Sequence, residues 1–333
     1  MSVYIIAEIG QAHDGSLGSA HAYIDAVAHA KVDAVKFQTH IAHAESTRHE
    51  QFRVKVFPQD VTRYDYWKRM EFTFQQWSDL AAHAQDVGLE FLSTPFSIEA
   101  VELLQMLDVP AFKIGSGDVS NFELIDEIIA TKKPILLSSG MSSYDELDDT
   151  VGRITTAGNK LSLFQCTTSY PCDANDIGYN VLAELKQRYK CPVGLSDHSG
   201  TIFPSIAAVA LGAELIEVHS VFSKQSFGPD TKSSLDMTEL KQLVDGVRFV
   251  ERGLANSINK NKAAEERKAT KELFSRSAFY TKDMKAGSVF SKDSFALKKP
   301  GGGMDVSHAK QLVGKTLKDD RNFDDFVSVE DFL

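Results

Sequence analysis

Eight short apolar runs, each followed by a stretch with helical periodicity, most constrain what this chain can fold into. The apolar runs cover residues 3–9, 33–39, 89–94, 110–115, 134–139, 161–167, 192–196 and 214–221. The helical patterns between them include residues 19–30, 73–88, 99–107, 121–131, 144–158 and 237–253. Strands that alternate with helices are parallel and joined by helical crossovers, and eight such units fill about 250 residues in a closed barrel. We therefore predict an α/β fold, a (β/α)8 TIM barrel, over residues 1–255.

An open, doubly wound sheet is the structural alternative. Such sheets usually carry a G-x-G-x-x-G turn after their first strand. The corresponding segment here reads EIGQAHDGSLG (8–18) and lacks that motif, which favours the closed barrel.

Nearly every apolar run turns polar at its C-terminal end. The residues found there are Glu8, Lys36, Gln38, Ser93, Thr94, Lys113, Ser138, Ser139, Thr167, Thr168, Ser196, Glu217 and His219. In a barrel these ends ring one mouth, which is where the active sites of this fold lie. Charged residues inside apolar strands cost free energy unless they are paired or used. A pattern repeated on eight strands therefore predicts a functional site at the mouth.

The composition argues against several other classes of protein. Hydrophobic residues make up 43% and charged residues 25% of the chain, which is typical of a soluble globular protein. No apolar run has the length of a membrane span, and the N-terminus lacks the basic region of a signal peptide, so we expect a cytoplasmic protein without membrane contact. The net charge of −10 argues against nucleic-acid binding. Cys166, Cys172 and Cys191 fit no metal-binding spacing and are expected to be reduced thiols.

The alternation ends at Gly253. Residues 256–272 are polar and charged and indicate a linker that is partly helical. Residues 273–333 are predicted to form a small second domain of short strands and turns, which at about 60 residues is marginal alone and is expected to lean on the barrel or on another subunit. Residues 40–72 are interpreted as a long structureless connection, a kind of loop that tends to be a lid or a dimer contact.

Two histidines are expected to converge at the mouth. His198 lies just beyond the seventh apolar run and His219 lies near the end of the eighth, and adjacent strands are about 4.8 Å apart. Two imidazoles with open remaining positions suit Mn, Zn, Co or Fe, and Mg is possible although it prefers oxygen ligands. The alternative is a hydrogen-bonded pair in which one histidine is a general acid. Asp230 could ligate the ion or hold a substrate hydroxyl, although Gly-Pro-Asp is also ordinary turn chemistry.

Lys36 and Lys113 end the second and fourth apolar runs. Buried lysines at a barrel mouth bind phosphate or carboxylate, or form a Schiff base. Two of them with several serines and a threonine nearby favour an anion-binding cup, whereas a Schiff-base aldolase would need one desolvated lysine and no metal. The purely structural alternative is a salt bridge from either lysine to Glu8 or Asp118.

The motifs together resemble the sialic acid synthase family, whose members make nonulosonic acids such as N-acetylneuraminate, legionaminate and pseudaminate. The motifs that carry the resemblance are AEIGQAHDG (7–15), VKFQT (35–39), FLSTPF (91–96), KIGSGD (113–118), LSSGM (137–141), CTTSYP (166–171), GLSDHSG (194–200) and GPDTKSSL (228–235). The stretch at 275–304 is similar to the antifreeze-like (SAF) domain of that family, which is small and mostly β. The resemblance covers almost the whole chain.

Family features can be carried over where residues match. The resemblance implies that His198 and His219 hold a divalent metal ion, with Mn²⁺ expected and Mg²⁺ or Co²⁺ as alternatives. It assigns phosphoenolpyruvate contacts to Lys36, Thr94, Lys113, Ser116, Ser138 and Ser196. It assigns sugar contacts to Gln38, Tyr170 and Asp230, and places Glu8 near the reacting centre. It also implies a domain-swapped homodimer in which an arginine at the position of Arg276 enters the site of the other subunit.

Some residues depart from the family pattern. Asp118 stands where many members have Glu, Thr168 stands where some have Asn, and EVHSVF (217–222) replaces the usual run there. Residues 43–71 also depart. These changes leave the phosphoenolpyruvate contacts intact and leave open which sugar is used.

The resemblance implies a transferase that condenses phosphoenolpyruvate with an open-chain N-acetylated amino hexose. The sugar would be N-acetylmannosamine or a 2,4-diacetamido-trideoxy hexose, and the products a nine-carbon 2-keto-3-deoxy acid and phosphate. One alternative is a 3-deoxy-octulosonate or -heptulosonate phosphate synthase on the same type of barrel. The other is a non-catalytic carbohydrate-binding protein that keeps the fold.

Overall fold

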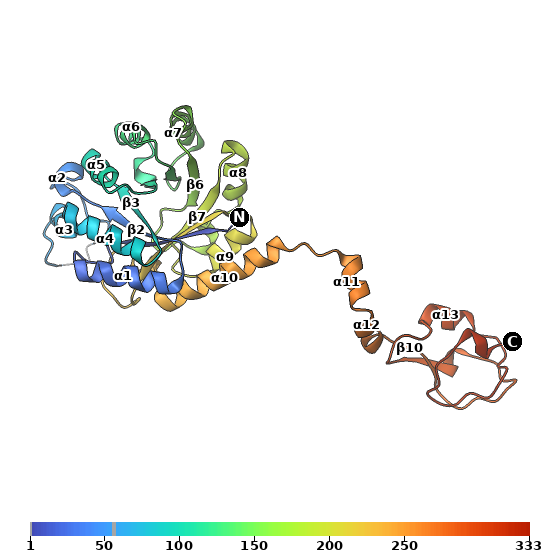
Figure 1. Ribbon diagram of the computed structural model, residues 1–333. Coiled ribbons are helices and arrows are strands. Elements are labelled where there is room, and N and C mark those ends of the chain that lie inside the picture. The colour runs from blue at the N-terminus through green and yellow to red at the C-terminus, as the bar shows by residue number, and fades with distance from the viewer. Residues whose placement is uncertain (1, 55–57) are drawn as a thin grey trace. The chain divides into compact units, whose positions relative to one another are not determined.

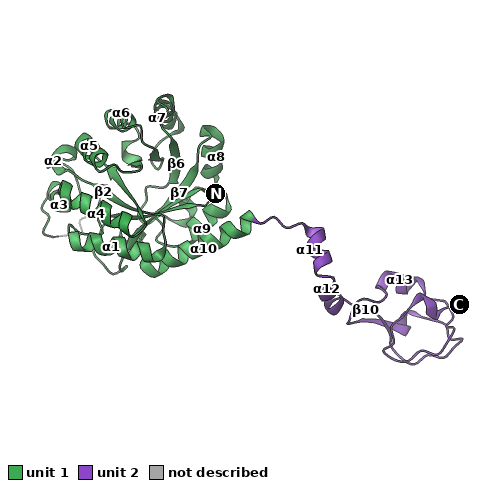
Figure 2. Ribbon diagram, in the orientation of Figure 1, with its two compact units in different colours: residues 1–255 green, residues 256–333 purple. Residues whose placement is uncertain are grey.

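The computed structural model describes residues 2–54 and 58–333. It divides into two compact units, residues 1–255 and residues 256–333 (Figure 2). Among the described residues, no helix has both the length and the apolar character needed to cross a bilayer.

The first unit is a closed barrel of parallel strands with its helices outside (Figure 1). The strands are β1 (Tyr4–Gly10), β2 (Ala34–Thr39), β3 (Glu90–Pro95), β4 (Phe112–Ile114), β5 (Ile135–Ser138), β6 (Leu161–Cys166), β7 (Val193–Asp197) and β8 (Leu215–Val221). Each strand pairs with its sequence neighbour, and β1 pairs with β8, where Glu8 lies opposite His219. The two-residue strand β9 (Leu235–Asp236) pairs with the end of β8. The predicted TIM barrel is therefore confirmed, and the open sheet is excluded by the closure.

Eight helices cover the barrel, and they alternate with the strands as the sequence predicts. They are α1 (Leu17–Ala30), α4 (Phe74–Asp86), α5 (Ile98–Met106), α6 (Phe122–Ala130), α7 (Tyr144–Thr156), α8 (Tyr179–Tyr189), α9 (Phe203–Ala210) and α10 (Met237–Ala255). Capping fixes where several of them begin: Thr73 and Ser143 each form a reciprocal capping box with the residue three positions on, which satisfies two of the free N–H groups of the first turn. The main apolar core lies between these helices and the outward-facing strand residues.

The connection at residues 40–72 is not structureless, so that expectation was wrong. It carries α2 (Ala42–Glu45) and α3 (Arg63–Met70), which share a small apolar cluster made by Ala42, Tyr66, Trp67 and Met70. Thr62 and Asp65 form a capping box at the start of α3. The segment is thus a small packed substructure inserted between β2 and α4, and residues 55–57 fall outside the described ranges.

The second unit has its own core. Its elements are α11 (Lys260–Glu266), α12 (Lys268–Phe274), β10 (Ser277–Tyr280), β11 (Phe295–Lys298) and α13 (Val306–Gln311), with β10 and β11 antiparallel. Tyr280, Phe290 and Leu317 are among the buried residues at its centre. The segment predicted to be a linker carries α11 and the first part of α12. The assignment of this unit as an antifreeze-like domain stays a prediction.

Candidate active site at the barrel mouth

The barrel interior is built in layers that follow from the two-residue period of strands. The apolar floor is made by Ile6, Ala34, Leu92, Ala111, Leu136, Phe164 and Leu215. On β7 the same layer holds Gly194, where a Cβ would lie 2.3 Å from the carbonyl oxygen of Leu215. Moving two residues along each strand gives the next layer: Glu8, Lys36, Thr94, Lys113, Ser138, Cys166, Ser196 and Glu217. The predicted polar ring is therefore one layer of a packed barrel, resting on an apolar floor.

The two lysines of this layer are held by two carboxylates. Lys36 forms an ion pair with Glu8, and its Nζ also lies 3.1 Å from Thr94 Oγ1. Lys113 Nζ donates to Glu217 Oε1 at 2.7 Å. Glu217 Oε1 also accepts from Ser196 Oγ at 3.1 Å and lies 3.8 Å from Lys36 Nζ. The salt bridge to Glu8, one of the structural alternatives, is therefore present for Lys36. Lys113 instead pairs with Glu217 and not with Asp118.

Burial and proximity shift the two carboxyl groups in opposite directions. Burial, assisted by the charge of Glu217, raises the pKa of Glu8 against the opposing charge of Lys36. Burial alone would also raise the pKa of Glu217, but the charges of Lys113 and Lys36 hold it well below its usual range. Such a divergence between two neighbouring acids separates their roles: Glu217 is the fixed counterion, and Glu8 is the group able to exchange a proton.

The histidine pair lies beside this layer. The rings of His198 and His219 have centroids 5.3 Å apart, and both residues are buried. Burial and the charge of His219 lower the pKa of His198 to about 4. Burial and the charge of Lys36 lower the pKa of His219 to about 3. Both are therefore neutral near pH 7, the protonation state in which imidazole binds metals.

The surroundings of His198 fit a metal ligand. Its Nδ1 lies 3.0 Å from the carbonyl oxygen of Thr167. Because that oxygen only accepts, Nδ1 carries the proton and Nε2 keeps a free lone pair, which is the usual arrangement of a ligating histidine. No cluster of three or more His, Cys, Asp or Glu side chains suited to a metal occurs in the described ranges. An ion bound by the two histidines would therefore keep several positions open for substrate or water.

An inner cavity of about 190 Å³ unites most of the predicted residues. The members of the predicted set that line it are Glu8, Lys36, Gln38, Thr94, Lys113, Ser116, Asp118, Ser138, Thr168, Tyr170, Ser196, His198 and His219. The hydroxyl of Ser138 is buried and has no hydrogen-bond partner in the described part of the chain. A buried polar group without a partner is costly, so this hydroxyl is available to a bound ligand.

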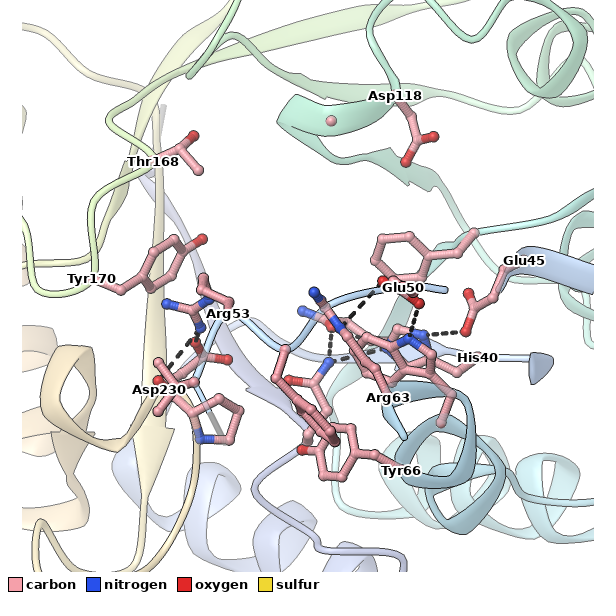
Figure 3. A pocket seen from close by; sticks show the side chains of 18 of the residues that line it. His40, Glu45, Glu50, Arg53, Arg63, Tyr66, Asp118, Thr168, Tyr170 and Asp230 are labelled. Atoms are coloured by element: carbon pink, nitrogen blue, oxygen red, sulfur yellow. Dashed lines mark hydrogen bonds and ion pairs between the residues drawn. The ribbon is translucent and has the colours of Figure 1, made fainter. Parts of the chain in front are cut away.

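An outer cavity of about 430 Å³ adjoins the inner one, and the two share Gln38, Phe96, Gly117, Asp118, Thr168, Tyr170 and His219. Asp230 lines this outer cavity rather than the inner one. Figure 3 shows Arg53, Tyr170 and Asp230 gathered on one side, with His40, Glu45, Glu50, Arg63 and Tyr66 on the other. Arg53 is hydrogen-bonded to Asp230, and its guanidinium lies 4.3 Å from the centroid of the Tyr170 ring.

Arg276 is the one predicted site residue outside the barrel unit. It lies just before β10, and its Nη1 donates to the carbonyl oxygen of Leu297 at 3.2 Å. Its expected entry into the site of another subunit stays a prediction.

Several residues at the site were missing from the predicted set, among them Glu217, Cys166, Arg53, His40, Gln11 and Glu45. Glu217 was visible as a charged residue inside an apolar strand, and Cys166 follows from the two-residue period once the floor is known. Arg53 and His40 come from a segment whose fold the pattern did not reveal. The Cys166 thiol is 3.8 Å from Ser116 Oγ and 3.9 Å from His198 Nδ1.

Comparison with known proteins shows what this arrangement is similar to. Residues 23–259 match the NeuB family. The N,N'-diacetyllegionaminic acid synthase of Campylobacter jejuni serotype O:2 is 32% identical over 329 residues, covering 97% of this chain and 98% of that protein. The pseudaminic acid synthase of C. jejuni serotype O:23/36 is also 32% identical, over 335 residues that cover 99% and 96%. The crystal structure of the N-acetylneuraminic acid synthetase of Leptospira borgpetersenii in complex with citrate has a TM-score of 0.71 at 28% identity, covering 82% of this chain and 93% of that one.

Proposed function

This chain belongs to the NeuB family, and on that premise we propose that it is a nonulosonic acid synthase. It condenses phosphoenolpyruvate with the open-chain aldehyde of an N-acylated amino hexose and releases phosphate, which makes it a transferase. Relatives named for different nonulosonic acids are equally similar to it, so N-acetylmannosamine and the 2,4-diacetamido-trideoxy hexoses are both candidate acceptors. The observation that carries the proposal is the pair of buried lysines beside a pair of neutral histidines in one cavity.

The inner cavity suits phosphoenolpyruvate. Lys36 and Lys113 supply two ammonium groups, and Glu8 and Glu217 supply two carboxylates. When Glu8 holds a proton, as its raised pKa favours, the cavity carries excess positive charge toward an anion. The hydroxyl groups of Thr94, Ser116, Ser138 and Ser196 then complete a set of donors for carboxylate and phosphate oxygens. Such donors stabilise charge that moves during reaction without having to reorganise.

The reaction is balanced by one water molecule. C3 of phosphoenolpyruvate attacks the aldehyde carbon and forms the new C–C bond, and the aldehyde oxygen takes up the proton that Glu8 holds. Water adds to C2 and gives a proton to a base, for which we assign the resulting carboxylate form of Glu8. The tetrahedral carbon then loses phosphate by cleavage of its C–O bond, and the proton of the added hydroxyl leaves with the phosphate. A divalent ion bound by His198 and His219, with Mn²⁺ proposed and Mg²⁺ or Co²⁺ as alternatives, would supply Lewis-acid polarisation of the aldehyde.

The test is phosphate release from phosphoenolpyruvate with Mn²⁺. It is run in parallel with N-acetylmannosamine, its 6-phosphate and the 2,4-diacetamido-trideoxy hexoses. Release with one sugar, abolished by EDTA and by His219→Ala, would establish the reaction and name the acceptor. No release with any of them would overturn the proposal. Release only with the 6-phosphate would name a phosphorylated acceptor and make the product a nonulosonic acid 9-phosphate.

A domain-swapped homodimer is part of the proposal, with Arg276 reaching the acyl group of the sugar in the other subunit's barrel. Loss of Arg276 should then raise the KM of the sugar far more than that of phosphoenolpyruvate. Co-expression of His219→Ala with Arg276→Ala tests the swap, because only a mixed dimer would contain one barrel with His219 that receives an intact arginine. Activity at low sugar concentration should return in that mixture. No recovery would place Arg276 on its own barrel or away from the site.

A further inference from the structure

A hydrogen-bonded chain runs from the outer cavity into the inner one and is not used by the chemistry above. It begins at Glu45, whose Oε1 lies 2.8 Å from His40 Nδ1 (Figure 3). His40 Nε2 lies 3.0 Å from Gln11 Nε2. Gln11 Nε2 also donates to Gln38 Oε1. Gln38 Nε2 donates to Glu8 Oε1 at 2.8 Å.

The chain has one consistent direction. A carboxylate can only accept, so the contact with Glu45 requires a proton on Nδ1 of His40. In the neutral ring Nε2 is then an acceptor, and it takes an N–H from Gln11 at 3.0 Å, while Gln38 Oε1 lies farther from it at 3.3 Å. The second N–H of Gln11 goes to Gln38 Oε1, which leaves the amide nitrogen of Gln38 facing Glu8. A flipped Gln38 would place its amide nitrogen against the amide nitrogen of Gln11, with two donors in contact.

Packing holds the start of this chain in place. The His40 ring lies between Trp67, at a centroid distance of 3.9 Å and an angle of 14°, and Phe96, at 4.6 Å and 6°. Trp67 belongs to α3 and is itself hydrogen-bonded to Glu50 at 2.9 Å. The orientation of His40 is thus set jointly by Trp67 of the inserted substructure and by Phe96, which follows β3 of the barrel, while Gln38 lies on β2. Rings fixed by stacking lose little further freedom when they hold a ligand contact.

Gln38 is where the two cavities meet, since it lines both. With Oε1 taken by Gln11 and one N–H taken by Glu8, its other N–H is left for an oxygen of a bound molecule. We propose that Glu45 and His40 are positioning residues for the acceptor sugar, which act through Gln11 to fix the amide of Gln38 at the junction of the two cavities. The inference rests on the proposed function for the identity of the sugar.

Two variants test the role kinetically. Glu45→Gln keeps the shape of the side chain but no longer dictates which ring nitrogen carries the proton. His40→Phe keeps the stack between Trp67 and Phe96 but removes both nitrogens. Each should raise the KM of the sugar by about tenfold, as expected for a lost charge-assisted hydrogen bond, with the KM of phosphoenolpyruvate within about twofold. Equal increases for both substrates would overturn the assignment.

A double-mutant cycle separates positioning from general damage. In a Gln38→Leu background, Glu45→Gln should have no further effect on the KM of the sugar, because the amide that it orients is gone. The matched control is Asp230→Asn, an acid that lines the same cavity but is hydrogen-bonded to Arg53 and not to any member of the chain. The effects of Asp230→Asn and Gln38→Leu should combine independently. Independent effects of Glu45→Gln and Gln38→Leu would overturn the proposal.

The direction of the hydrogen-bonded chain can be tested without measuring enzymatic activity. Nitrogen NMR of the ¹⁵N-histidine-labelled protein, with the His40 signals assigned by their loss in His40→Phe, should show a proton on Nδ1. A ring that carries a proton on Nε2, alone or together with Nδ1, would overturn the chain. The NMR measurement distinguishes failure of the proposed function from failure of the further inference. A wild-type protein that is inactive with every acceptor would overturn the proposed function, and the tautomer of His40 would still decide whether the hydrogen-bonded chain exists.

Discussion

The inner and outer cavities share a wall but are built in different ways. The inner one consists largely of strand residues that project from consecutive layers of the barrel, and its four charges are buried and matched in pairs. The outer one is lined largely by residues of the 40–70 substructure and of the loops at 168–170 and 229–230, several of which are half-exposed. The inner cavity therefore determines which reaction can occur. Residues of the outer cavity can change with less cost in stability, and they determine which substrate is bound. Mutations should therefore affect stability most in the inner cavity and substrate preference most in the outer one.

The largest expected effect belongs to Glu217→Gln. It leaves Lys36 and Lys113 buried with one carboxylate fewer, and breaking a buried charge pair typically costs about 3 to 5 kcal/mol. Urea unfolding followed by tryptophan fluorescence reports on the barrel alone, because Trp67 and Trp77 are the two tryptophans of the chain.

The matched control for this variant is Glu214→Gln. Glu214 pairs with Lys186 at 2.7 Å on the surface, where such a pair is worth less than about 1 kcal/mol. Equal losses of unfolding free energy in the two variants would contradict the view that the buried lysines of the inner cavity depend on Glu217 for their charge partner.

The inner cavity was largely predictable from the sequence, for a physical reason. Strand periodicity and the cost of burying charge act locally, so Lys36, Lys113 and the polar strand ends could be recognised one strand at a time. Their partners were harder to predict. Asp118 was a plausible partner for Lys113 by closeness in sequence, but the closed barrel brings Glu217 within 2.7 Å from 104 residues away.

The outer cavity was not predictable because its order depends on contacts distant in sequence. The 40–70 substructure is anchored to the loop after β1 through Arg69, which bonds to Asp14, 55 residues away, and also pairs with Asp60 within the substructure at 2.7 Å. It is further joined through Arg53 to Asp230, 177 residues away. Such pairs leave no periodic pattern in the sequence, so the segment was interpreted as a structureless loop.

The intermediate effect belongs to Arg69→Gln. Asp60 is 4% exposed and would lose its charged partner, at a cost of about 1.5 to 3 kcal/mol for hydrogen bonds to a charged group. We expect faster amide exchange in α3, with the barrel strands unchanged, measured by hydrogen–deuterium exchange. Lys68→Gln is the control on the same helix, because its pair with Glu71 is exposed. Faster exchange throughout the barrel would show that the two regions do not unfold separately.

The smallest effect on stability, with the clearest effect on preference, is expected for Arg53→Gln. The Arg53 side chain is 41% exposed, so its ion pair with Asp230 contributes less than about 1 kcal/mol to unfolding. However, Arg53 also lies over Tyr170, and together these contacts join the 40–70 substructure to the loops at 168–170 and 229–230. We expect the KM of the sugar to rise severalfold with little change for phosphoenolpyruvate, and Arg48→Gln, which removes a cation over Tyr64 on the same segment, to leave both values unchanged. A rise for phosphoenolpyruvate equal to that for the sugar would mean that the outer wall supports the inner cavity, and the division between the two regions would fail.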